Sequence, residues 1–103
     1  MATKIRKKLK ISKFDAADFL HSDKDVISFL QACIEEADDD PSVIAEALGV
    51  IARARGGIAK VAKAARLTRE GLHKALSRGG NPSLATFLKV TRAIGVRMVA
   101  KSA

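Results

Sequence analysis

The side chains best suited to chemistry in this 103-residue chain are cations and hydrogen-bond donors gathered between residues 58 and 78. Arg69, His73 and Lys74 fall within two turns of one predicted helix, which presents them outward together with Glu70. The inward positions of that helix hold apolar residues, namely Leu72, Ala75 and Leu76. Arginine and lysine donate hydrogen bonds to guanine edges in the major groove of DNA. We therefore predict that Arg69, His73 and Lys74 contact base edges, and that Glu70 belongs to the same DNA-binding face.

Polar residues around this helix are candidates for a second kind of contact. The predicted phosphate-binding residues are Lys60, Thr68, Ser77 and Arg78. Such side chains bind phosphate oxygens without reading sequence, and they fix the register of a protein on the duplex. The pattern alone does not decide the function, because paired amphipathic helices also occur in all-α domains that never touch DNA.

Other reactive side chains give no catalytic or metal site. The chain has two histidines and one cysteine, with no glycine-rich phosphate loop after a strand and no nucleophile with an evident base. The run Asp38-Asp39-Asp40 has no further ligands at the spacing of a calcium loop. Cys33 lies on an apolar helical face, which indicates a buried thiol in a reducing compartment. We predict no enzyme activity, no cofactor and no metal.

The elements that position the cations form a predicted helix-turn-helix over residues 58–77. Its first helix has small and aliphatic residues at helical spacing, namely Ile58, Val61, Ala62 and Ala65. Thr68 is a good N-cap, so a second helix begins at about Arg69 and runs to Leu76. In a helix-turn-helix the second helix reads base edges and the first crosses the phosphate backbone. Residues 69–76 are thus the predicted recognition helix.

The charge distribution supports nucleic-acid binding. Residues 56–103 hold ten cations and one acid, a net charge of +9, whereas residues 14–55 hold ten acids and three cations, a net charge of −7. Residues 1–13 hold six cations and no acid. A basic segment that coincides with the helix-turn-helix gains affinity for DNA by releasing condensed counterions.

The remainder of the chain predicts an all-α fold of about five to six helices, with a basic N-terminal tail at 1–13 and a single helical domain at 14–103. Further helices are expected at 15–20, 25–37 and 41–54, and a last one follows Ser83 with an inward stripe. That stripe consists of Leu84, Phe87, Leu88, Thr91 and Ile94. Gly95 suits the residue after the last helix, and residues 96–100 could form a short strand or a tail. With no long apolar run and no signal peptide, we expect a cytoplasmic protein and no membrane contact.

The chain resembles the HigA-like antitoxins, also described as putative addiction-module antidote proteins, over roughly residues 14–100. The resemblance is strongest in Phe14-Asp15-Ala16-Ala17, in Ile51-Ala52-Arg53-Ala54-Arg55-Gly56, and after the helix-turn-helix in Gly80-Asn81-Pro82-Ser83-Leu84 and Leu88-Lys89-Val90. It implies a lambda-repressor-like helix-turn-helix. It also implies an antitoxin that binds a RelE/HigB-like toxin, usually encoded beside it, and that represses their shared promoter as a homodimer on double-stranded operator DNA.

Several features of this interpretation stay open at the level of sequence. The acidic helices of residues 14–55 are expected to face the toxin, or else the basic tail wraps around it. Two chains could pair through residues 95–100, through exposed apolar residues of the last helix or through the N-terminal half. A stand-alone transcriptional regulator, or a protein-binding inhibitor that has lost DNA binding, would also fit.

Two residues depart from the pattern of the family. Arg66 stands at a turn position commonly held by glycine, where a positive φ costs a non-glycine residue about 1 kcal/mol. Gly71 lies inside the recognition helix, where it costs about 1 kcal/mol relative to alanine. Gly71 could permit close approach of the backbone to DNA, or it could simply weaken the helix.

Overall fold

The computed structural model describes residues 16–103, so the predicted basic tail at 1–13 lies outside the described residues. The described chain forms a short 3-10 helix, η1 (Ala16–Phe19), followed by five α-helices and no strand. The helix predicted at 15–20 is therefore a single 3-10 turn over the part that the structure describes. The predicted all-α class is confirmed.

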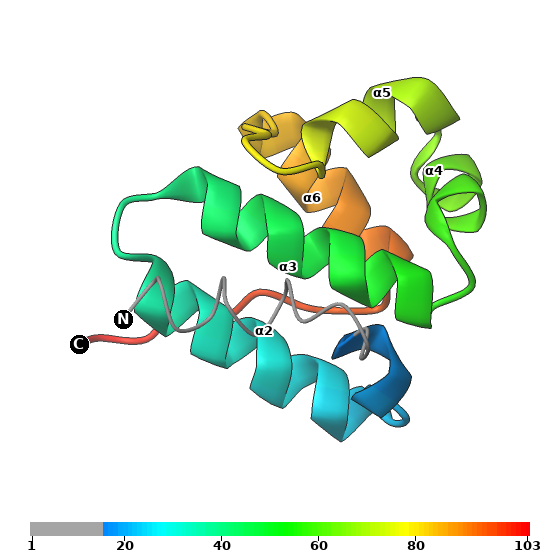
Figure 1. The fold of residues 1–103 in the computed structure, drawn as a ribbon. Coiled ribbons are helices and arrows are strands. Elements are labelled where there is room, and N and C mark those ends of the chain that lie inside the picture. Colours follow the sequence, from blue (N-terminus) through cyan, green and yellow to red (C-terminus); the bar gives the residue numbers. More distant parts are fainter. Residues whose placement is uncertain (1–15) are drawn as a thin grey trace.

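The acidic half of the described chain is built on two antiparallel helices, α2 (Asp23–Ala37) and α3 (Pro41–Ala54) (Figure 1). Ser22 caps α2 in a capping box, in which its Oγ accepts from the Asp25 amide at 3.2 Å and the Asp25 carboxylate accepts from the Ser22 amide at 3.2 Å. Asp40 caps α3, accepting from the Ser42 amide at 3.0 Å. Local capping chemistry thus fixes where both helices begin.

The basic half consists of three shorter helices, α4 (Ile58–Ala65), α5 (Arg69–Ala75) and α6 (Leu84–Ala93). Helices α4 and α5 pack against each other at an angle, and α6 packs against α4 (Figure 1). Figure 1 shows α2 and α5 at opposite ends of the fold, with α3 between them. The predicted helix-turn-helix region therefore lies at one end of the fold, away from α2.

The core joins the two halves through α3. Leu48 and Ile51 of α3 are fully buried, together with Leu72 of α5 and Val90 of α6. Cys33 of α2 is also fully buried and belongs to no disulfide within residues 16–103, as its place on an apolar face predicted. No helix among residues 16–103 is long and apolar enough to cross a membrane.

The inward stripe predicted for the last helix is partly wrong. Leu84 and Leu88 are 73% and 48% exposed, whereas the other predicted residues do face inward, with Thr91 and Ile94 buried and Phe87 half-buried. Val90, which was not predicted, is also buried. Successive residues lie about 100° apart around a helix, so Leu88 turns outward once Phe87, Val90 and Ile94 face the core. Three- and four-residue spacings fit both a stripe that includes Leu84 and Leu88 and a stripe that includes Val90 in their place. The packing of α6 against α4 selects the stripe with Val90.

The chain ends in a tail rather than a strand. Gly95 adopts a positive φ of 82°, and the amide of Val96 donates to the Thr91 carbonyl at 2.8 Å, which closes α6 with a Schellman motif. Residues 96–103 form neither helix nor strand and run as an extended segment (Figure 1). Of the two predicted forms for residues 96–100, the tail is the one observed.

Candidate nucleic-acid interface

The turn between α4 and α5 sets the direction of the predicted recognition helix. Arg66 takes a left-handed conformation with φ 59° and ψ 42°, as expected for the position that commonly holds glycine. The Leu67 amide donates to the Ala62 carbonyl at 2.9 Å. Thr68 then caps α5, with its Oγ1 accepting from the Gly71 amide at 3.0 Å. The start of α5 at Arg69 is therefore confirmed.

The buried side of α5 anchors it to the rest of the protein. Leu72 and Leu76 are 1% and 5% exposed and belong to the main core. At Gly49 of α3, a Cβ would lie 3.1 Å from the carbonyl oxygen of Leu76. The missing side chain of Gly49 thus lets the end of α5 come close to the middle of α3.

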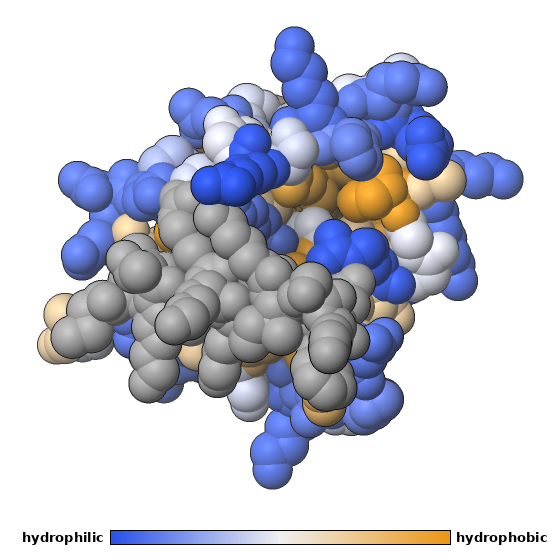
Figure 2. All heavy atoms as spheres, in the orientation of Figure 1, coloured by the Kyte–Doolittle hydropathy of each residue, from blue (hydrophilic) through white to orange (hydrophobic). Residues whose placement is uncertain are grey.

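The outward side of α5 is free for a ligand. All four predicted residues, Arg69, Glu70, His73 and Lys74, are exposed. Within residues 16–103, no hydrogen bond or ion pair engages any of these four side chains. Figure 2 shows mostly hydrophilic residues at the top of the molecule, over α5. Long side chains that form no hydrogen bond or ion pair with the described residues can bind a ligand without breaking such a contact.

The predicted phosphate-binding residues surround this face but differ in what they can still donate. Lys60 and Arg78 are exposed and lie on α4 and just after α5. Thr68 uses its oxygen as an acceptor within the cap, so its hydroxyl proton can still be donated. Ser77 is half-buried, and its hydroxyl already donates to the Lys74 carbonyl at 2.8 Å. Ser77 is therefore the weakest donor of the four.

A hollow of about 470 Å³ next to α5 adds residues that the sequence reasoning treated only as a loop. Its lining includes Lys74 and Arg78 together with Gly79, Gly80 and Asn81. The Gly80 amide donates to the Ser77 carbonyl at 2.8 Å, which folds this loop back against the end of α5. In the sequence, the adjacent glycines Gly79 and Gly80 were the signal that could have indicated this hollow, because glycine permits close approach of the backbone.

Glu70 is the only acid among residues 56–103, and it lies within the outward face. A carboxylate near the start of a helix is favoured by the helix dipole. It is also the side chain that accepts a hydrogen bond from the amino group of cytosine, whereas it repels phosphate. Glu70 therefore suits a position over bases rather than over the backbone of a duplex.

Comparison with known proteins identifies the family. The family profile described as "probable addiction module antidote protein" matches residues 10–102. The chain belongs to this antidote family. An uncharacterized protein of Haemophilus influenzae is 40% identical over 88 residues, which is 85% of this chain and 88% of that protein. No solved structure matches the chain.

The antidote-family chain carries most of its acidic residues on or beside α2, away from α5. Residues 16–40 hold eight acids and one lysine, and most of these acids are exposed on or beside α2. No cluster of histidine, cysteine or acidic residues within 16–103 is arranged to hold a metal ion. The described part of this antidote protein thus offers two surfaces of opposite charge, separated by α3.

Proposed function

We propose that this protein is a HigA-like antitoxin of a type II toxin-antitoxin system. As a homodimer with lambda-repressor-like helix-turn-helices, it represses its own operon by sequence-specific binding to operator DNA. It also neutralises a RelE/HigB-like toxin by direct binding, in the cytoplasm and without enzymatic activity. The observation that carries the DNA-binding role is the outward face of α5, where Arg69, His73 and Lys74 are exposed and unpaired within the described residues.

Each part of the protein has a role in this proposal. The exposed face of α5 enters the major groove, and Lys60, Thr68 and Arg78 bind the flanking phosphates. The acidic surface on and beside α2 faces the toxin, because toxins of this kind are typically basic. Membership of the antidote family supports the existence of a toxin partner.

The experiment is a titration of the purified full-length chain against DNA from directly upstream of its gene, at several salt concentrations. Scrambled DNA of equal length is the control. We expect a preference of about 10³-fold or more for the upstream DNA at near-physiological salt. Equal and steeply salt-dependent binding to both DNAs would contradict specific repression, and would leave a protein-binding role as the main function.

Two substitutions sharpen this titration. Arg69→Ala should reduce the discrimination between the two DNAs, at a cost of about 1–3 kcal/mol, because base-edge contacts carry sequence information. Lys24→Ala removes a cation of the same charge from α2, at the opposite end of the fold, and should leave both affinities unchanged. If Arg69→Ala binds the operator as tightly as the parent chain, Arg69 is not part of the interface. A stand-alone regulator would give the same results with both substitutions, but it would not bind the protein encoded by the neighbouring gene.

A further inference from the structure

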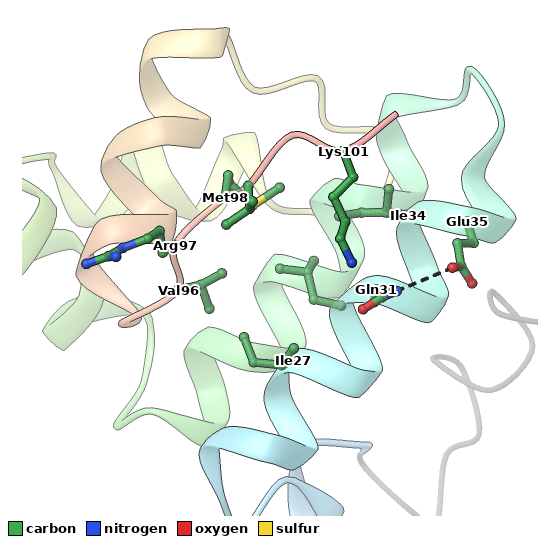
Figure 3. Close-up of a pocket in the computed structure, with 10 residues that line it drawn as sticks. Ile27, Gln31, Ile34, Glu35, Val96, Arg97, Met98 and Lys101 are labelled. Carbon is green, nitrogen blue, oxygen red and sulfur yellow. Dashed lines mark hydrogen bonds between the residues drawn. The ribbon is translucent and has the colours of Figure 1, made fainter. Parts of the chain in front are cut away.

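A groove of about 580 Å³ runs between α2 and the C-terminal tail, away from the proposed DNA interface. Its walls are largely apolar, with Ile27 and Ile34 on α2 facing Val96 and Met98 of the tail (Figure 3). Leu30 also lines the groove. Three of its lining residues are exposed to an unusual degree for apolar side chains, namely Ile27 at 43%, Met98 at 44% and Val99 at 73%. An apolar groove open to solvent on a small protein indicates a surface that a partner covers.

The tail that forms one wall is an unpaired extended segment. In Figure 3, Val96 and Met98 point toward α2, whereas Arg97 between them points away, which is the alternation of a β-strand. From Arg97 onward, no backbone hydrogen bond is formed with any part of residues 16–103. Extended segments with free amide and carbonyl groups readily pair with another extended chain.

The charges around the groove show what kind of partner fits. Its lining carries one acid, Glu35 on α2, and two cations, Arg97 and Lys101 on the tail. Glu35 is held only by a hydrogen bond from Gln31 at 3.5 Å, and none of the ion pairs described for residues 16–103 joins it to either cation. A lining with more cations than acids does not suit a basic protein. It does suit a second copy of itself, since Lys101 on the tail of one copy can meet Glu35 on α2 of the other copy.

We propose that this groove is the surface through which two copies of the chain pair. The two tails run antiparallel about a two-fold axis and form a two-stranded ribbon, each covering the groove of the other copy. A two-fold contact requires such a self-complementary surface, on which the same residues serve both copies. This inference rests on the proposed function, which needs a dimer, and it selects one of the pairing surfaces that the sequence left open.

The arrangement leaves the proposed DNA interface accessible. None of the residues that line the groove belongs to α4, α5 or the loop after α5. Two half-sites on DNA lie about 34–36 Å apart, one helical turn. The protein measures 38 × 33 × 27 Å, so two copies placed side by side span that distance.

The first test measures the mass of the full-length chain by light scattering over a range of concentrations. Val99→Glu and Ile27→Glu, one on each wall, should each raise the dissociation constant of the dimer by about tenfold or more, because a buried carboxylate would lose its hydration. Leu84→Glu is the matched control, because Leu84 is as exposed as Val99, at 73%, but lies on α6. Its dissociation constant should stay within about twofold of the parent value.

The second test uses charge reversal across the two copies. Glu35→Arg and Lys101→Glu should each weaken the dimer, and the chain with both substitutions should recover most of the parent affinity. A loss that is simply additive in the double variant would overturn the pairing of α2 with the partner's tail. Because both side chains are exposed, these variants keep the fold intact.

The remaining outcomes separate this inference from the proposed function. If Leu84→Glu makes the chain monomeric while Val99→Glu does not, the pairing surface is α6, and the inference fails while the dimeric repressor stands. If Val99→Glu leaves the dimer intact but abolishes binding of the neighbouring gene's product, the groove is a toxin site and the inference fails. A parent chain that is monomeric both alone and on operator DNA overturns the inference and the dimeric form of the proposed function together.

Discussion

Gly80 and Gly79 are adjacent glycines that should respond very differently to the same substitution. A Cβ on Gly80 would lie 2.2 Å from the carbonyl oxygen of Ala75 and 2.8 Å from that of Ser77. A Cβ on Gly79 would meet nothing within 4 Å, and the constraint there is only the positive φ of 79°. The new side chain in Gly80→Ala would therefore clash with main-chain atoms of Ala75 and Ser77. In Gly79→Ala it would meet no other atom, and the only cost is the left-handed conformation of residue 79.

The expected loss in the free energy of unfolding follows from the clash at Gly80 and from the positive φ at Gly79. Carbon and oxygen atoms make contact at about 3.3–3.6 Å, so in Gly80→Ala the loop must move back by about 1 Å. This movement breaks the hydrogen bond from the Gly80 amide to the Ser77 carbonyl, now 2.8 Å. Loss of the hydrogen bond together with overpacking should lower the free energy of unfolding by about 2–4 kcal/mol. Gly79→Ala should lower it by only about 1–2 kcal/mol, the cost of a left-handed residue.

The assay is urea unfolding followed by circular dichroism, supported by thermal melts. For a protein of this size, Gly80→Ala should lower Tm by about 10–20 °C. Gly79→Asn is the control, since asparagine tolerates a left-handed conformation and should change stability little. Equal destabilisation by Gly79→Ala and Gly80→Ala would refute the argument that the carbonyl of Ala75 excludes a side chain at position 80.

Two further predictions concern the turn and the start of α5. Arg66→Gly should raise the free energy of unfolding by about 1 kcal/mol, because Arg66 has a φ of 59°, and Arg66→Ala should show no such gain in the urea midpoint. Gly71→Ala alone should change stability little. Its gain in helix propensity, about 1 kcal/mol, is offset because the new Cβ would lie 2.7 Å from Thr68 Oγ1 and disturb the cap. In a Thr68→Ala background the same change should stabilise by about 1 kcal/mol, and strictly additive effects in this double-mutant cycle would contradict the explanation.

The parts of the fold that could be predicted from sequence are those decided by neighbouring residues. Thr68 is the N-cap that the sequence predicted, and Asp40 and Ser83 cap helices that begin directly after them, where helices were predicted to begin. Each of the three accepts a backbone hydrogen bond from two or three residues ahead. Capping depends only on a short side chain and the next turn of backbone, so sequence is sufficient. The outward exposure of the candidate side chains on α5 was predictable for the same reason, since it follows from helical periodicity.

Features that depend on distant segments could not be predicted. The exposure of Leu84 and Leu88 is set by how α6 meets α4, which periodicity leaves undecided. The groove beside α2 exists because the tail folds back over residues about 70 positions earlier in the chain. No local pattern in α2 or in the tail indicates that these two segments lie side by side. The close approach at Gly80 likewise depends on the path of the loop. DNA binding by the candidate residues stays a prediction.

The separation of charge between the ends of the fold bears on how the protein would meet a polyanion. Residues 16–40 carry eight acids and one lysine, whereas residues 56–92 carry eight cations and one acid, a net charge of +7, and α2 and α5 lie at opposite ends (Figure 1). In the field of DNA, such a molecule experiences a torque as well as an attraction. It turns its α5 end forward before contact, so more encounters begin in a productive orientation. The association rate should then fall with ionic strength more steeply than net charge alone would require, because salt screens the alignment as well as the attraction.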